Sequence, residues 1–251
     1  MSSSITDAQL QNWENFCRHH AIGDWHGTWS IYDLEGKLIR QFQCIRSFQI
    51  SADGNEINHQ NHYIYPDNTT KLETFEPRRK PNKEALFLET SFSWGSIEVK
   101  PSSIFFFEIG FRNEDRRRSA VVRYNEDGTV DILIISEHLG SFSNEPPLPL
   151  ANQLNGWEGI ATSMTPNDCI VSPTQAILWM PLEDLNKKYL TLHLQNGISI
   201  SVPHQIESGQ NFFLAAEWLV NPTLLQRSIR HFDTSEFISF TLEVFKRPLK
   251  G

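Results

Sequence analysis

The spacing of apolar residues at the start of the chain is that of a helix. Apolar and aromatic side chains recur every three or four residues from Leu10 to His20, which places them on one face of a short amphipathic helix. Thr6 and Gln9 have the spacing of a capping box at its start, and Gly23 is a suitable residue to end it. The sequence therefore predicts one short N-terminal helix.

From residue 27 onward the period changes to that of strands. Short runs that alternate apolar and polar residues are separated by turn sequences such as DLEG at 33–36 and EDG at 126–128. Many antiparallel strands at this cadence are typical of a sandwich or a barrel. The predicted strands of this part are 27–32, 38–50, 56–65, 70–75, 85–92, 103–111, 116–124 and 129–136.

A proline-rich stretch interrupts this pattern between residues 138 and 153, and its composition is typical of a stiff linker. The strand pattern then resumes. The predicted strands of the second part are 157–163, 170–180, 188–194, 197–203, 211–220, 223–232 and 236–246. We therefore expect a first domain over 1–140, a linker over 141–153 and a second, shorter domain over 154–251.

Two stretches of the chain repeat. GDWHGTW at 23–29 returns in softer form as NGWEGIA at 155–161, and the strand at 118–124 is paralleled by 226–232. Self-similarity of this kind indicates two related units. The predicted fold class is all-β, with two consecutive antiparallel lipocalin-like barrels produced by internal duplication and a short N-terminal helix.

A Gly-x-Trp at the first strand of a barrel, preceded by a short helix, resembles the lipocalin or calycin superfamily. Gly23-Asp24-Trp25 carries this resemblance, and FCRHHAIGDWHGTWSIYD at 16–33 is similar to the opening of lipocalin-type phycobiliprotein lyases. The two-unit layout is most similar to a cyanobacterial family of paired lipocalin-like domains with no assigned function. The resemblance implies that Trp25 plugs the closed end of the first barrel beside a cation, for which Arg118 and Arg123 are the candidates.

Composition narrows the environment and the partners. The net charge is −8, and Asp and Glu outnumber Lys and Arg in both halves, which argues against a nucleic-acid partner. The chain has no apolar run long enough to span a membrane as a helix and no secretory signal at its start. Its three cysteines lack CxxC spacing, so we expect reduced thiols and a cytoplasmic location.

Side-chain alternation selects candidates for a ligand site inside the first barrel. On strand 38–50, Arg40 and Arg46 interrupt an otherwise apolar face that we assign to the interior. A buried cation must be paired, so Arg46 either meets an acidic group of a ligand or forms an internal salt bridge. A bulge that turns the arginine outward is the third alternative.

The neighbouring strands supply the other candidates. Strand 56–65 carries His59, His62 and Tyr63 and is polar enough to line a wet cavity. Convergent ligands for a metal are not evident, because these histidines lie on opposite faces, so we expect no metal and no cofactor. The full set of predicted ligand-binding residues is Trp29, Arg40, Arg46, His59, His62, Tyr63, Phe105, Phe107, Arg118 and Arg123.

Three functions remain open from the sequence. The first is the binding of a small, mostly apolar, acid-bearing ligand, such as a tetrapyrrole, a carotenoid or a fatty acid, in the first barrel. The second is an enzyme, a bilin lyase or an isomerase, acting in the same pocket through groups such as His62, Tyr63 or Glu89. The third is a scaffold with filled barrels and an exposed apolar patch for a protein partner.

Overall fold

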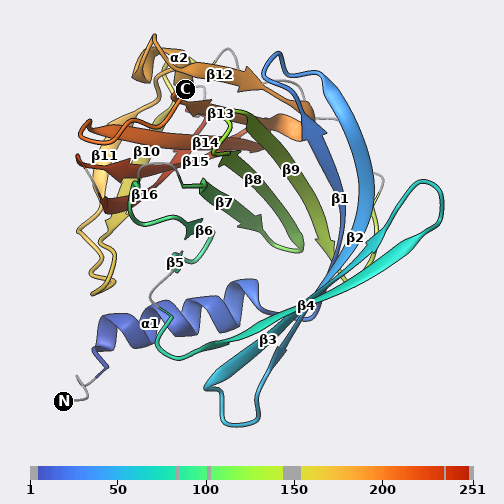
Figure 1. Cartoon of the computed structure of the whole chain (residues 1–251). Coiled ribbons are helices and arrows are strands. Elements are labelled where there is room, and N and C mark those ends of the chain that lie inside the picture. Colours follow the sequence, from blue (N-terminus) through green and yellow to red (C-terminus); the bar gives the residue numbers. More distant parts are fainter. Residues whose placement is uncertain (1–4, 83–84, 101–102, 144–153, 235, 249–251) are drawn as a thin grey trace.

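A computed structural model gives the fold and describes residues 5–82, 85–100, 103–143, 154–234 and 236–248. The predicted helix is present as α1 (Asp7–Asn15), continued by the π-helical turn η1 (Phe16–His20). Its capping box is formed as expected, since Thr6 and Gln9 exchange hydrogen bonds between side chain and backbone, each of 3.2 Å. The remainder is almost entirely antiparallel strand, arranged in two sheets (Figure 1).

The first sheet is a nine-stranded half-barrel with the order β4-β3-β2-β1-β9-β8-β7-β6-β5. All neighbouring strands are antiparallel, and the pairing of β1 with β9 joins the first four strands to the last five. Its strands are β1 (Asp24–Tyr32), β2 (Leu38–Ile50), β3 (Glu56–Ile64), β4 (Thr70–Arg79), β5 (Ala85–Phe87), β6 (Ser91–Gly95), β7 (Phe105–Asn113), β8 (Arg116–Tyr124) and β9 (Val130–Leu139).

The second sheet has seven strands in the order β11-β10-β16-β15-β14-β13-β12. Two short helical segments lie beside it, α2 (Leu182–Leu185) and the 3-10 turn η2 (Gln195–Gly197). Its strands are β10 (Glu158–Met164), β11 (Gln175–Leu178), β12 (Leu190–His193), β13 (Ile198–Val202), β14 (Phe212–Asn221), β15 (Leu224–Phe232) and β16 (Phe237–Lys246).

The prediction of two closed barrels is not confirmed. β4 and β5 are the two edges of the first sheet, and the chain passes from one to the other through a short connection rather than a ladder. Helix α1 lies across this end of the sheet (Figure 1). The Asn12 side chain bonds the Ala85 carbonyl and the Phe87 amide next to β5, while Trp13 Nε1 donates to the Gly54 carbonyl beside β3. The helix thus joins the two sides that the strands leave apart.

The two sheets pack against each other through one shared core. Phe105 in β7 lies 5.9 Å from Phe212 in β14 and 5.4 Å from Phe232 in β15, measured between ring centroids. Phe107, Ile109 and Phe111 continue this buried face. In the second sheet the same core takes up alternating side chains of β13, β14 and β16. Among the described residues, the cluster with the most buried apolar side chains therefore lies between the sheets, outside the half-barrel.

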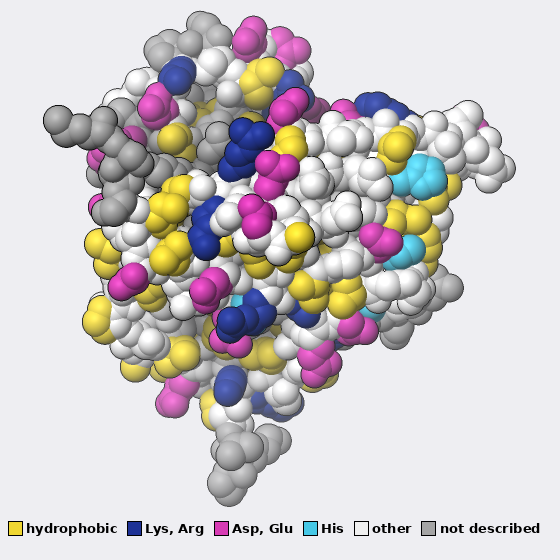
Figure 2. Space-filling model, turned by 90° about the horizontal axis from the view of Figure 1, so that it is seen from below, with side chains coloured by type: hydrophobic (Ala, Val, Ile, Leu, Met, Phe, Trp, Pro, Cys, Tyr) yellow, Lys and Arg dark blue, Asp and Glu magenta, His cyan; other side chains and the backbone are white. Residues whose placement is uncertain are grey.

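The strand registers match between the sheets. Phe105 pairs with Tyr124 as Phe212 pairs with Phe232. Likewise, the β8–β9 pairing of Arg117 with Glu137 corresponds to the β15–β16 pairing of Leu225 with Phe245. The matching faces of the two sheets meet in the shared core, and the opposite faces point away from it. Seen from below, Lys and Arg side chains lie among Asp and Glu rather than in one patch (Figure 2).

Candidate functional site

The concave face of the half-barrel encloses a cavity of about 660 Å³. Side chains from all nine strands of the first sheet and from η1 line it. Half of the lining residues, histidines included, carry an aromatic ring, which gives large apolar contact area with rigid geometry. The aromatic lining residues other than histidine and tyrosine are Phe16, Trp29, Phe48, Phe75, Phe87, Phe92, Trp94 and Phe106.

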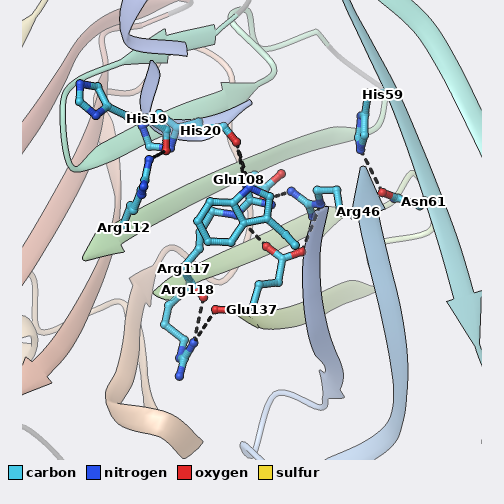
Figure 3. Close-up of polar contacts among 11 residues, drawn as sticks. His19, His20, Arg46, His59, Asn61, Glu108, Arg112, Arg117, Arg118 and Glu137 are labelled. Carbon is cyan, nitrogen blue, oxygen red and sulfur yellow. Dashed lines mark hydrogen bonds and ion pairs between the residues drawn. The ribbon is translucent and has the colours of Figure 1, made fainter. Parts of the chain in front are cut away.

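Two arginines and two glutamates form a charged cluster at the buried end of this cavity, which we call the floor (Figure 3). Arg46, Arg117 and Glu108 line the cavity, whereas Glu137 is fully buried beside them and does not line it. Arg46 Nη1 lies 3.3 Å from Glu108 Oε1, and Arg46 Nε lies 3.4 Å from Glu137 Oε1. Arg117 Nε donates to Glu137 Oε2 at 2.7 Å, and its Nη1 donates to the His20 carbonyl at 3.2 Å. The four side chains come from β2, β7, β8 and β9, so the cluster ties together strands from both halves of the sheet.

The floor is buried, and the ion pairs keep it charged. Burial alone would raise the pKa of Glu137, which is 0% exposed, but Arg117 and Arg46 outweigh it and lower that pKa. The pKa of Arg46 is raised because Glu137 and Glu108 outweigh its desolvation. Removing one member of such a cluster leaves a buried charge without compensation, which is costly. The cluster is therefore an internal salt bridge, the second of the three alternatives for Arg46.

The GDWHGTW stretch supports this floor from β1. Trp25 is fully buried, and the Arg117 guanidinium carbon lies 4.3 Å from the centroid of its ring. Gly27 pairs with Glu137 across β1 and β9. A Cβ at Gly27 would lie 2.4 Å from Glu137 Cγ and 2.7 Å from the Ser136 carbonyl oxygen, so only glycine leaves room for the buried glutamate.

One wall of the cavity carries a chain of hydrogen bonds from β3 to β4. His59 Nε2 contacts Asn61 Oδ1 at 2.9 Å, Asn61 Nδ2 donates to Tyr63 Oη at 2.9 Å, and Tyr63 donates to Glu73 at 3.0 Å. The His59 ring is stacked between Phe48 and Phe75. Burial, with a smaller effect of nearby arginines, lowers the pKa of His59 to about 3. The imidazole is therefore neutral at neutral pH.

The outer part of the cavity is bounded by Trp94, Phe106 and two further arginines. The Arg78 guanidinium carbon from the edge strand β4 lies 3.2 Å from the ring centroid of Trp94 on β6, the strand next to the other edge, so this contact bridges the opening of the half-barrel. Arg123 lies on β8 opposite Phe106 and is exposed. We call the group Trp94, Phe106, Arg78 and Arg123 the rim.

The predicted site residues divide into two groups. Trp29, Arg46, His59, Tyr63 and Arg123 line the cavity. The others do not. Arg40 is exposed and stacks on Phe42 and Tyr65, His62 lies on the opposite face of β3, and Phe105, Phe107 and Arg118 belong to the side of β7 and β8 that faces the second sheet.

The prediction that Phe105 and Phe107 of β7 point into the barrel is wrong, because the opposite face of this strand lines the cavity. Phe105 and Phe107 pack into the core between the sheets, while Phe106 and Glu108 face the cavity. The physical reason is that the contact between the sheets buries its side chains almost completely, whereas the cavity lining includes charged groups, so the contact takes the more apolar face. In the second sheet, the faces that begin at Ile198 and Phe240 lie in the same shared core.

Sequence reasoning missed three members of the floor. Arg117, Glu108 and Glu137 were not among the predicted residues, although Arg117 is the cation that stacks on Trp25. The alternation of β8 contained a usable signal, because Arg117, Val121 and Arg123 share one face. Among the described residues there is no cluster of His, Cys, Asp and Glu suited to a metal ion. In the described part of the chain, no helix is long and apolar enough to cross a membrane.

Comparisons with known proteins identify the family but not an activity. Residues 176–247 match the family described as the C-terminal domain of "Biogenesis factor required for ATP synthase 1". A crystal structure of a DUF3598 protein of unknown function from Nostoc punctiforme is 23% identical, covers 99% of this chain and 100% of its own, and has a TM-score of 0.77. It therefore shares the fold.

Two further results carry no argument. Kievitone hydratase from Nectria haematococca is 7% identical over 92% of this chain and 91% of its own, but its TM-score is 0.25. No curated protein matches the chain.

The family is shown by the first part of the chain. Residues 9–142, more than half of the chain, match the family described as "Domain of unknown function (DUF3598), N-terminal". The protein therefore belongs to the DUF3598 family.

Proposed function

We propose that this protein binds a small, mostly apolar, acid-bearing molecule inside the half-barrel. The single observation that carries the proposal is the aromatic cavity of about 660 Å³ on the concave face of the first sheet. Cavities of 300–1,000 Å³ with an apolar lining and a few fixed polar groups are typical small-molecule sites. Tetrapyrrole-like, carotenoid-like and fatty-acid-like molecules have the required apolar bulk and an acidic group for the arginines.

Binding without catalysis fits the titratable groups better than a lyase or isomerase. A general acid or base works best when its pKa is near the working pH. The pKa of His59 is lowered to about 3, and burial raises the pKa of Tyr63 above its usual range. Neither of these cavity residues is poised to exchange a proton at neutral pH. His62, the other candidate for acid–base chemistry on β3, faces away from the cavity.

The proposal is tested with N-phenyl-1-naphthylamine, an uncharged dye that fluoresces in apolar sites. We expect wild-type protein to bind it with a saturable fluorescence increase. Val121→Trp, which adds an indole to the cavity wall, should reduce the affinity at least tenfold because the ring occupies ligand volume. The matched control is Ile160→Trp, at a 51% exposed position of the second sheet. Equal binding by both folded variants would contradict the proposal.

A second candidate function concerns the second sheet. Ile160 and Leu178 are 51% and 72% exposed on the neighbouring strands β10 and β11, and they lie on one face because Glu158 pairs with Leu178 and Ile160 with Ala176. Exposed apolar groups gathered in one place mark sites of protein contact. Because this region matches a domain named for a biogenesis factor of ATP synthase, we propose that this flank docks a protein of that assembly.

The docking proposal is tested by binding of purified ATP synthase subunits to immobilised protein. We expect Leu178→Glu, which places a charge on the flank, to abolish capture of the subunit that wild-type protein retains. Leu72→Glu, at a 62% exposed position of β4 in the first sheet, is the matched control and should retain it. Failure of every subunit to bind wild-type protein would refute the proposal and leave the cavity proposal untouched.

A further inference from the structure

The charges around the cavity are distributed unevenly between its floor and its rim. On the floor, two guanidinium groups and two carboxylates are ion-paired with one another, so the floor as a whole is neutral. On the rim, Arg123 has no hydrogen bond or ion pair to any described residue, although Asp131 is its partner across β8 and β9 and accepts a hydrogen bond from Asn125 instead. A ligand therefore meets a tightly ion-paired charge cluster at one end and, at the other, a cation that forms no direct ion pair.

The distance between these ends suits an elongated molecule. Arg117 and Arg123 lie on the same face of β8, six residues apart, which is about 20 Å along an extended strand. Arg117 is 1% exposed, whereas Arg123 is exposed to solvent. The strand thus runs from the buried floor to the open rim, with Val121 between them in the wall of the cavity.

The buried end also has polar atoms without partners. Among the described residues, Trp29 Nε1, Arg117 Nη2 and His20 Nδ1 are buried without a hydrogen bond, and all three residues line the cavity. The first two are donors. His20 Nε2 contacts the Leu88 carbonyl, so Nε2 carries the proton and Nδ1 is an acceptor. Buried polar atoms of this kind are normally satisfied, and a ligand group that both accepts and donates would satisfy them.

An acidic group does not suit this end. Glu108 and Glu137 already neutralise Arg46 and Arg117. A third anion on the floor would be desolvated beside two carboxylates with no cation left to compensate it, which is unfavourable. At the rim the same group meets the guanidinium of Arg123, which forms no direct ion pair and still contacts water, so its desolvation costs less.

We infer that the ligand lies with its anionic group against Arg123 at the rim and with an uncharged hydrogen-bonding group, a hydroxyl or an amide, against the floor. The inference rests on the proposed binding function and specifies the class and orientation of the ligand. It also moves the recognition of the acid from Arg46, the residue indicated by the sequence, to Arg123.

A matched pair of dyes tests the anionic end. 8-Anilinonaphthalene-1-sulfonate is N-phenyl-1-naphthylamine with one added sulfonate, so the difference in their affinities measures recognition of the anion. We expect Arg123→Gln to weaken binding of the sulfonated dye about three- to tenfold and to leave the uncharged dye unchanged, as for one charge-assisted contact at a partly exposed site. Arg40→Gln is the control, since it removes an exposed arginine of the same sheet outside the cavity.

Glu108→Gln distinguishes the two ends. This isosteric change removes the carboxylate next to Arg46 and leaves the side chain in the cavity wall. If the anion lies at the rim, the affinity for the sulfonated dye changes less than twofold. A tenfold or greater gain would place the anion on the floor and overturn the inference.

The uncharged end is tested by displacement of N-phenyl-1-naphthylamine with 2-naphthol and with naphthalene. Trp29→Phe removes the indole N–H and keeps an aromatic ring. We expect it to weaken the binding of 2-naphthol several-fold and that of naphthalene hardly at all. Equal losses of affinity for both would overturn the assignment.

If the uncharged dye does not bind wild-type protein at all, the proposed function itself fails. If it binds but neither Arg123→Gln nor Trp29→Phe discriminates between the paired molecules, only the orientation fails.

Discussion

Strand pairing defines a set of three neighbouring positions that recurs in each sheet. In the first sheet these positions hold Arg117, Glu137 and Gly27. In the second sheet they hold Leu225, Phe245 and Gly159. The glycine is the same in both because a Cβ would strike the facing side chain and backbone in either sheet. The other two positions have changed from an ion pair to an apolar pair.

The comparison shows that a buried ion pair alone does not keep a cavity open. The second sheet has its own pair on this face, in which Arg227 Nη2 donates to Glu217 at 2.8 Å. There, however, the segment before α2 covers it, and Arg227 also donates to the Met180 carbonyl. Trp157, Trp179 and other apolar side chains fill the rest of the face. In the first sheet, the β3–β4 hairpin and the helix enclose space instead of filling it.

The largest expected effect is the loss of Glu137. Glu137→Leu leaves Arg117 without its carboxylate and Arg46 with only Glu108. We expect a loss of about 3–5 kcal/mol in the free energy of unfolding, measured by urea denaturation, because the buried Arg117 loses its ion pair and Arg46 loses one of its two.

The apolar pair of the second sheet supplies the control. Arg117→Leu combined with Glu137→Phe introduces the residue types found at Leu225 and Phe245. It removes the cation that Glu137→Leu leaves unpaired, and Arg46 remains paired with Glu108. We expect this double variant to be more stable than Glu137→Leu alone. A double variant that is less stable would show that the ion pair is needed for more than charge compensation.

The sequence located the helix and most of the strands, but the single strand predicted over 85–92 is two strands, β5 and β6, and the one predicted over 170–180 is only β11. It was less informative about which face of each strand points inward. Alternation along β7 correctly groups Phe105 with Phe107 and Phe106 with Glu108. It cannot tell which group faces the cavity, because that depends on how the second sheet packs. Barrel closure was not readable for the same reason, since it depends on whether β4 and β5 meet and on where α1 lies.

The partners of Arg46 were also beyond the sequence. A charge on an apolar face indicates a pairing requirement, and the internal salt bridge was one of the alternatives. The carboxylates that satisfy it are 62 and 91 residues away, on β7 and β9. Their side chains are brought to β2 only by the curvature of the sheet. No local pattern around Glu108 or Glu137 marks them as partners.

Substitution of the matching glycines, Gly27 and Gly159, compares the two sheets through a smaller expected loss of stability. A Cβ at Gly27 would lie 2.7 Å from the Ser136 carbonyl oxygen, and one at Gly159 would lie 2.7 Å from the Val244 carbonyl oxygen. Because backbone must move in both cases, we expect Gly27→Ala and Gly159→Ala each to destabilise by about 1–3 kcal/mol. Only Gly27→Ala should also weaken dye binding, since it displaces Glu137 on the cavity floor. Loss of dye binding in both variants would mean that the cavity of the first sheet depends on the packing of the second sheet.

The smallest effect concerns pH. His59 has a pKa of about 3 in the folded protein and about 6.5 in an unfolded chain, so below pH 6.5 the unfolded chain binds more protons and stability falls. Between pH 7 and pH 5 this one group should cost about 1–2 kcal/mol. His59→Phe, which keeps the stack between Phe48 and Phe75, should remove that part of the acid sensitivity in urea denaturation series.

His231 supplies the control, because it occupies the position in the second sheet that matches Arg123. Burial lowers its pKa too, but less strongly than that of His59. His231→Phe should therefore change the pH dependence of stability less. An equal change in both variants would show that acid sensitivity is not concentrated at the cavity.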